Sequence, residues 1–83
     1  MKLFLTKKAQ KHFEGLDQSH QTRVLHKLEL LEKNPYVGKK LAGKLVGFYT
    51  LRVWPYRVIY QVNKKQQEIW VVSILHRQGS YKA

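Results

Sequence analysis

The chain has 83 residues, a net charge of +11 and no cysteine, which predicts a single domain over residues 1–83 without disulfides or thiolate metal sites. Apolar residues make up 43% of it, enough for a globular core and unlike a disordered tail. The apolar run in Met1–Leu5 is too short for a signal peptide or a membrane span. We therefore expect a cytoplasmic protein with no membrane partner.

The charge is distributed unevenly along the sequence. From Lys33 onward, ten basic residues accompany a single acid, Glu68. This half of the chain should attract polyanions, and a nucleic-acid backbone is the functional interpretation. A solvated basic surface and an acidic protein partner explain the net charge equally well.

The N-terminal part predicts a short strand and a first helix. Lys2–Leu5 fits an edge strand, because Leu3 and Leu5 share one face. Thr6 fits the N-cap of a helix over Lys7–Leu16, whose apolar residues follow helical spacing.

A second, longer helix follows, capped by Asp17 or Ser19. It ends before Asn34-Pro35, since a proline and its preceding residue disfavour helix. The apolar stripe of this helix consists of Val24, Leu25, Leu28 and Leu31. Two antiparallel helices joined by a short turn are the simplest arrangement.

The remainder predicts a basic loop and then β-structure. Tyr36–Lys44 has the glycines and lysines of a loop. Phe48–Val53, Tyr56–Asn63 and Glu68–His76 are rich in β-branched and aromatic residues, and their short connections predict an antiparallel meander. The predicted fold class is α+β, with an N-terminal helical hairpin packed on one face of a small, mainly antiparallel sheet of three or four strands.

The alternation of side chains along a strand assigns faces to the sheet. If Val58 and Val62 pack on the helices, Arg57 and Gln61 lie on the uncovered face. The same alternation predicts that four residues of the last strand share a side, namely Trp70, Val72, Ile74 and His76.

The sequence gives no pattern for a metal or a nucleotide cofactor. His12, His20 and His26 do not have the i, i+4 spacing of a helical metal site, no cluster of carboxylates accompanies them, and we expect all three on the surface. The glycines are too widely spaced for a phosphate-binding loop. We expect neither a metal nor a cofactor.

Basic, imidazole and phenol groups gather near the C-terminal ends of the predicted sheet. The candidate catalytic residues are Arg57, His76, Arg77 and Tyr81, and the candidate substrate-binding residues are Lys39, Lys40, Lys44 and Arg52. Such groups suit RNA cleavage without a metal, in which the ribose 2′-hydroxyl attacks the adjacent phosphate. Arginine would hold the phosphate, His76 is the natural group for proton transfer, and Tyr81 would donate a proton or stack on a base.

Each of these residues also has a structural interpretation. Arg57 can pair with Glu68 across strands, although one acid cannot serve three arginines. His76 can be a structural histidine at a strand end, Arg52 can brace the hairpin, and Tyr81 can belong to a disordered tail. Three aromatic residues are better explained by packing than by base stacking, namely Tyr56, Tyr60 and Trp70.

The order of four short blocks resembles the RelE/ParE superfamily of toxin–antitoxin toxins. The blocks are Leu41-Ala42-Gly43, Tyr49-Thr50-Leu51-Arg52, Tyr56-Arg57-Val58-Ile59-Tyr60-Gln61-Val62 and Ile74-Leu75-His76-Arg77 with Tyr81 close behind. The resemblance covers nearly the whole chain and implies a RelE-like toxin domain that a cognate antitoxin neutralises.

In the RelE branch, the resemblance implies a toxin that enters the ribosome and cuts mRNA there without a metal. Arg57 matches the phosphate-binding arginine of that branch, and Arg77 matches the arginine near the end of the last strand. Tyr81 matches the C-terminal tyrosine less well because its spacing from Arg77 is shorter. The lysine pair expected before Arg52 is absent, because Phe48 and Thr50 stand there. His76 or Lys44 would then take over proton transfer.

The ParE branch shares the fold but resembles a gyrase poison. Its members generally lack the set formed by Arg57, His76, Arg77 and Tyr81, so this set favours the nuclease. We predict a ribosome-dependent, metal-independent mRNA endoribonuclease that inhibits translation, with the ribosome, mRNA and an antitoxin as partners. The alternatives are a gyrase inhibitor without nuclease activity and a non-toxic RNA-binding module.

Overall fold

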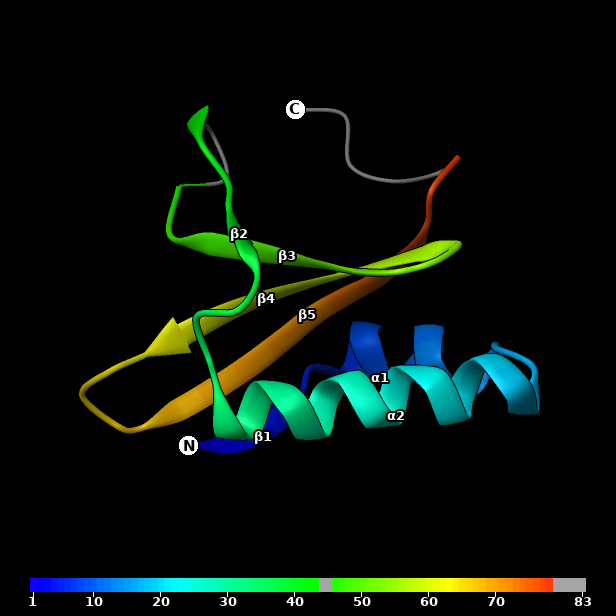
Figure 1. The fold of residues 1–83 in the computed structure, drawn as a ribbon, viewed down its shortest axis with the longest axis horizontal. Coiled ribbons are helices and arrows are strands. Elements are labelled where there is room, and N and C mark those ends of the chain that lie inside the picture. Colours follow the sequence, from blue (N-terminus) through cyan, green and yellow to red (C-terminus); the bar gives the residue numbers. More distant parts are fainter. Residues whose placement is uncertain (44–45, 79–83) are drawn as a thin grey trace.

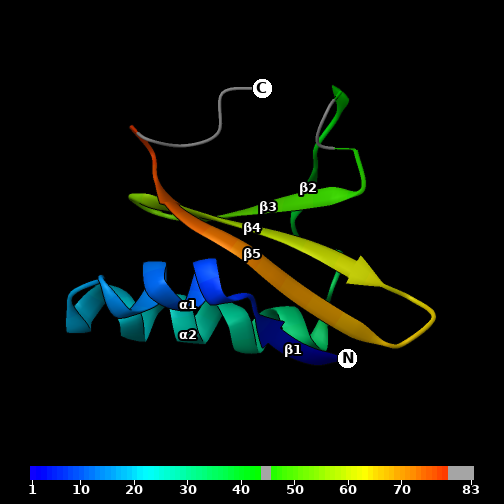
Figure 2. The same ribbon diagram turned by 180° about the vertical axis from the view of Figure 1, so that it is seen from behind.

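Two helices and a sheet form the two layers of the protein. The computed structural model describes residues 1–43 and 46–78. Its elements are β1 (Lys2–Leu5), α1 (Lys7–Glu14), α2 (Gln18–Lys33), β2 (Lys39–Lys40), β3 (Phe48–Val53), β4 (Tyr56–Asn63) and β5 (Glu68–His76). Both helices lie on the same side of the sheet (Figure 1 and Figure 2), which confirms the predicted α+β fold class.

Within the described residues the sheet has five strands, in the order β1-β5-β4-β3-β2. The prediction of three or four strands was wrong because Lys39–Lys40, assigned to a loop, forms β2 and pairs antiparallel with β3. A strand of two residues is too short to show an alternating pattern. At the other edge β1 pairs parallel with β5, which confirms the predicted edge strand.

Side-chain caps set where the helices begin. Thr6 Oγ1 accepts a hydrogen bond from the Ala9 N–H (3.2 Å), and Asp17 Oδ1 accepts one from the His20 N–H (2.9 Å). Of the two predicted caps for α2, Asp17 is therefore the one used. Helix α1 ends two residues earlier than predicted, at Glu14, and the N–H of Gly15 closes its last turn on the Lys11 carbonyl (3.1 Å).

The core lies between the helices and the sheet. Its buried residues are Ala9, Val24, Leu28, Leu31, Val53, Val58, Tyr60, Ile69, Val71 and Ile74. Three of the four residues in the predicted stripe of α2 belong to it. Leu25 does not, and 49% of its surface is exposed.

An extra residue in β5 changes which side chains face the helices. Ile59 pairs with Ser73 and Tyr60 pairs with Val71, which leaves Val72 without a partner on β4. Val71 and Ile74 consequently both belong to the core although three positions separate them. The prediction that Trp70, Val72, Ile74 and His76 share one side was wrong, because strict alternation stops at this β-bulge.

His12 stabilises the bulge from α1, so its assignment to the surface was also wrong. Its Nδ1 accepts a hydrogen bond from the N–H of Ile74 (3.1 Å), next to the bulge. Burial, with a further contribution from nearby Lys8, lowers the pKa of His12. The neutral imidazole is the form that can accept this bond.

The hydroxyl of Tyr60 anchors the segment between α2 and β2. It donates to the Pro35 carbonyl (2.9 Å) and accepts from the N–H of Gly38 (3.0 Å), while its ring stacks on Tyr49. Burial raises the pKa of Tyr60, which keeps the hydroxyl protonated and able to donate. Of the aromatic residues predicted to pack, Tyr60 is fully buried and Trp70 stacks on Phe4, as expected.

Gly38→Ala should destabilise the protein by about 1–3 kcal/mol, because the added methyl group overpacks this contact. A Cβ at Gly38 would lie 2.5 Å from the Tyr60 hydroxyl and 2.8 Å from the Thr50 carbonyl oxygen. Gly15→Ala is the matched control, since its Cβ would meet no atom closer than 3.6 Å. Urea unfolding measures both variants, and equal stabilities would contradict the proposed anchor.

Stability should fall as the pH drops below about 6.5, the unperturbed value for histidine. The pKa of His12 is lower in the folded state, so the unfolded chain binds the proton first as the pH falls. The free energy of unfolding therefore decreases between the pKa of the unfolded chain and that of the folded protein. Urea unfolding between pH 8 and pH 5 measures the slope. His12→Gln should flatten it, whereas His26→Gln, at an exposed position of α2, should not. Equal slopes for His12→Gln and the wild type would refute this origin.

Candidate basic nucleic-acid interface

The face of the sheet opposite the helices, called the uncovered face because no described helix packs on it, carries two neighbouring arginines. Arg52 of β3 pairs in register with Arg57 of β4, while their chain neighbours Val53 and Val58 belong to the core. Alternation therefore directs both arginines away from the helices, which confirms the expected face for Arg57. Arg57 is half-buried and Arg52 is exposed.

Neither arginine forms an ion pair with a carboxylate among residues 1–43 and 46–78. The alternative pairing of Arg57 with Glu68 is not found: Glu68 lies opposite Asn63, at the far end of β4, and accepts a hydrogen bond from Trp70 Nε1 (3.1 Å). Like charges directly across a strand pair are destabilising. An anion that lies between the two guanidinium groups would remove this cost.

Among the described residues, the register neighbours of Arg57 on this face include no group that exchanges protons near neutral pH. Its register neighbours on the open side are Leu75 of β5 and Arg52 of β3. Further along, Thr50 pairs with Ile59, and both are buried. A groove of about 530 Å³ adjoins them, lined by Thr6, Lys8, Phe48, Ile59, Val72, Ser73 and Leu75. The centre of the face is thus apolar, and the arginines stand at one end of it.

His76 lies at the end of β5 but is directed to the other side from Arg57. It pairs with Tyr56, whereas Arg57 pairs with Leu75. The rings of His76 and Tyr56 meet edge to face at 5.4 Å, and His76 Nδ1 accepts a hydrogen bond from the N–H of Gln78 (3.3 Å). The exposed His76 therefore has its Nδ1 engaged and its ring oriented by a tyrosine.

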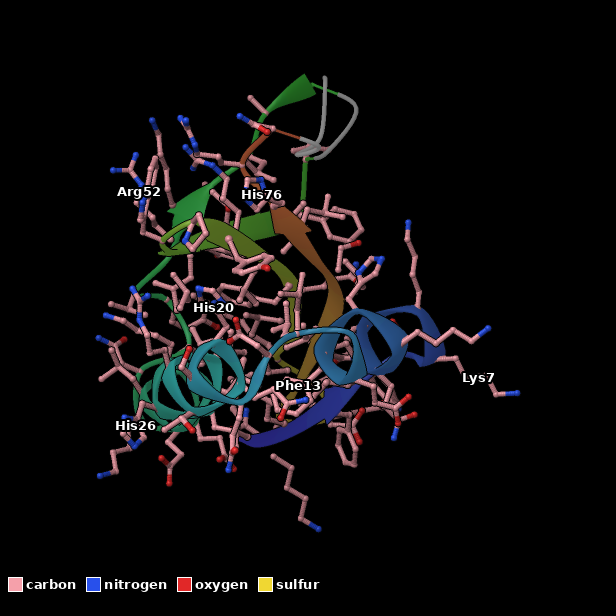
Figure 3. All side chains as sticks on the ribbon, turned by 90° about the vertical axis from the view of Figure 1, so that its right-hand side faces the viewer. Lys7, Phe13, His20, His26, Arg52 and His76 are labelled. Carbon is pink, nitrogen blue, oxygen red and sulfur yellow. The ribbon has the colours of Figure 1, made fainter. Side chains whose placement is uncertain are left out.

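Tyr56 also links His76 to the start of α2. His20 meets the Tyr56 ring edge to face at 5.1 Å, and its Nδ1 lies 2.9 Å from Asp17 Oδ1. Hydrogen bonds from the His20 N–H and the Ser19 hydroxyl lower the pKa of Asp17. Figure 3 shows His20 between the helices and the strands, with Arg52 and His76 at the level of the strands. The expectation of a surface position was wrong for His20, which is half-buried.

Arg77 contacts a residue that the sequence-based prediction missed. Its guanidinium carbon lies 4.7 Å from the centroid of the Trp54 ring, and its backbone N–H donates to the Pro55 carbonyl (2.7 Å). Trp54 is 52% exposed at the turn between β3 and β4. The signal available in the sequence is a tryptophan next to a turn proline, between two basic residues.

The predicted lysines lie elsewhere. Lys39 and Lys40 are exposed on β2, where they pair with Thr50 and Tyr49, nearer to the start of β3 than Arg52 is. Lys44 and Tyr81 fall outside the described residues. The structure thus brings Arg52 and Arg57 together, places His76 and Arg77 beside the turn, and separates both pairs from Lys39 and Lys40.

The described ranges 1–43 and 46–78 contain neither a metal site nor a membrane-spanning helix. No group of three or more His, Asp or Glu side chains lies close enough together to hold a metal ion. No helix there has the length and apolar character needed to cross a membrane.

The sequence and the fold match one group of known proteins. A family model described as ParE toxin of type II toxin-antitoxin system, parDE, matches residues 3–81. No curated protein sequence matches the chain.

Similar solved structures come from bacteria and archaea. The toxin–antitoxin complex RelBE2 from Mycobacterium tuberculosis gives a TM-score of 0.85 at 23% identity, covering 92% of this chain and 96% of that one. The isolated E. coli RelE toxin gives 0.81 at 21%, covering 99% and 86%. The archaeal RelE–RelB complex from Pyrococcus horikoshii gives 0.76 at 27%, covering 95% and 97%.

Proposed function

This chain belongs to the ParE toxin family of type II toxin–antitoxin systems, and we propose that it inhibits translation as a ribosome-dependent mRNA endoribonuclease. The observation that carries the proposal is the cross-strand pair of Arg52 and Arg57, two cations on the uncovered face without a carboxylate partner in the described chain. Its partners are the cognate antitoxin, the ribosome and mRNA, and its place of action is the cytoplasm.

Arg57 holds the scissile phosphate in this proposal. Cleavage by the ribose 2′-hydroxyl adds negative charge to the phosphate in the transition state, and a guanidinium can bind two of its oxygens at once. Arg57 is half-buried, so its charge is less screened by water than that of an exposed lysine. Arg52 and Arg77 supply further positive charge at the same end of the sheet.

His76 moves protons in this proposal, and Tyr81 is the second candidate. The Nδ1 of His76 already accepts the Gln78 N–H, so its Nε2 is the atom that can exchange a proton with RNA. Because His76 projects to the side of Tyr56, the RNA strand must pass around the end of β5 to meet both His76 and Arg57.

The second candidate function is inhibition of DNA gyrase. One observation favours it: the family model that matches residues 3–81 is that of ParE toxins. Such an inhibitor acts by binding and needs no proton-transfer group of its own.

Arg57→Gln should lower mRNA cleavage about a hundredfold or more, because it removes charge stabilisation from the transition state. The measurement maps mRNA ends after the purified chain is added to a translating extract. Lys65→Gln is the matched control, since Lys65 is exposed in the turn between β4 and β5. Intact mRNA together with arrested supercoiling in a parallel gyrase assay would replace the nuclease by the second candidate.

His76→Ala should slow cleavage by about 10²- to 10⁴-fold, the usual contribution of general acid–base catalysis. Binding to the ribosome, measured by co-sedimentation, should change little because the substitution removes no fixed positive charge. Gln66→Ala provides the control, since Gln66 is exposed in the turn between β4 and β5. Cleavage at the wild-type rate would remove His76 from the mechanism.

A further inference from the structure

A second basic surface lies on the helix side of the β3–β4 turn. A groove of about 340 Å³ separates α2 from the end of β3, and it is lined by Arg23, His26, Lys27, Arg52, Val53 and Trp54. One wall is a helical face, since Arg23, His26 and Lys27 are spaced i, i+3, i+4. The other wall is the end of β3, beyond the short stretch that β2 covers.

The groove concentrates positive charge without compensation. Three of its lining residues are permanent cations, and no carboxylate lines it in the described part of the chain. Each cation is exposed to solvent and makes no ion pair among the described residues. Repulsion between like charges that line one groove costs free energy, and a bound polyanion recovers it.

Trp54 gives the groove an apolar platform beside these cations. Its indole ring is 52% exposed, and the Arg77 guanidinium lies over it at 4.7 Å. An exposed aromatic ring offers a flat apolar surface on which a nucleobase can stack. Aromatic rings next to a cationic groove are the usual combination for single-stranded nucleic acid, in which bases stack on the rings and cations follow the backbone.

We infer that this groove binds a single-stranded segment of RNA, with Trp54 stacking on a base and the α2 wall holding the adjacent phosphates. The choice of RNA rests on the proposed function. Arg52 lines the groove and is also the register partner of Arg57, so one strand can run from the uncovered face around the β3–β4 turn into the groove. Figure 3 shows Arg52 and His26 on the same side of the molecule, opposite Lys7.

An acidic peptide is the competing occupant, and Trp54 argues against it. A carboxylate chain would satisfy Arg23, Lys27 and Arg52 but carries no flat ring that could stack on the exposed part of the indole, beside the Arg77 contact. A nucleotide supplies both the anion and the flat ring. The groove would therefore recognise nucleotides that flank the scissile one.

The test measures binding of a fluorescently labelled 12-nucleotide oligouridylate to the purified full-length chain by anisotropy, at several salt concentrations. Cleavage in this proposal requires the ribosome, so binding is measured separately from nuclease activity. Arg23→Gln/Lys27→Gln should weaken binding about tenfold. It should also reduce the slope of log Kobs against log salt by about 1.4, as expected for two lost contacts to single-strand phosphates.

Lys7→Gln/Lys11→Gln is the matched control, because it removes the same charge from two exposed lysines four residues apart on α1. It should weaken binding no more than about twofold through net charge. In a Trp70→Phe background, RNA should quench the fluorescence of Trp54, and Trp54→Leu should weaken binding at least about fivefold, the lower range for one stacked base.

Three results would overturn the inference. The first is an equal loss of affinity in the two double variants. The second is RNA binding that does not quench the fluorescence of Trp54. The third is binding of a 12-residue polyglutamate or a DNA 12-mer as tight as that of the RNA. If the wild-type chain does not cleave mRNA on the ribosome but the binding results are as expected, the proposed nuclease activity is refuted and the proposed RNA-binding groove is retained. Thermal unfolding midpoints of the two lysine and arginine double variants should match the wild type, since their substituted side chains are exposed, and Trp54→Leu is compared with its own Trp70→Phe background.

Discussion

The β-bulge at Val72 determines which side chains of β5 face the helices and which face the other side of the sheet. Up to Val71, β5 alternates in the order that buries Ile69 and Val71 against the helices, and after the bulge the order is reversed so that Ile74 is buried. His12 accepts the N–H of Ile74 beside the irregularity, which attaches α1 to the strand at that point. The side to which His76 projects therefore depends on a single inserted residue, next to which His12 accepts its hydrogen bond.

Most of the fold could be predicted from the sequence, because the residues that begin and end its helices give local signals. Thr6 and Asp17 occupy cap positions that residue type alone suggests, and Asn34-Pro35 ends α2 where proline chemistry requires. The β-bulge could not be predicted, since Val72 fits an uninterrupted alternating strand as well as a bulged one. The half-buried positions of His12 and His20 could not be predicted either, because their partners Ile74 and Tyr56 lie far away in the chain.

The candidate site could be predicted only in part, because some of its residues come together only in the tertiary structure. Alternation along β4 was sufficient to place Arg57 on the uncovered face, because no irregularity precedes it in that strand. The groove beside Trp54 needed tertiary structure, since Arg23 and Lys27 come from a helix and Arg52 from a strand about thirty residues away. Net charge indicated that cations would meet a polyanion but gave no indication of which cations share a surface.

The uncovered face shows why the chemistry cannot be completed there. Phe48 and Thr50, which stand where the resembled branch carries lysines, lie on the same side of β3 as Arg52, and Thr50 is buried. Arg57 thus has cationic and apolar neighbours but no group that exchanges protons near neutral pH. In the proposed nuclease, phosphate binding and proton transfer are consequently divided between two sides of the sheet that meet at the β3–β4 turn. An RNA strand that bends around this turn reaches Arg57, His76 and the groove in one path, which is the arrangement that the exposed Trp54 and Arg77 favour.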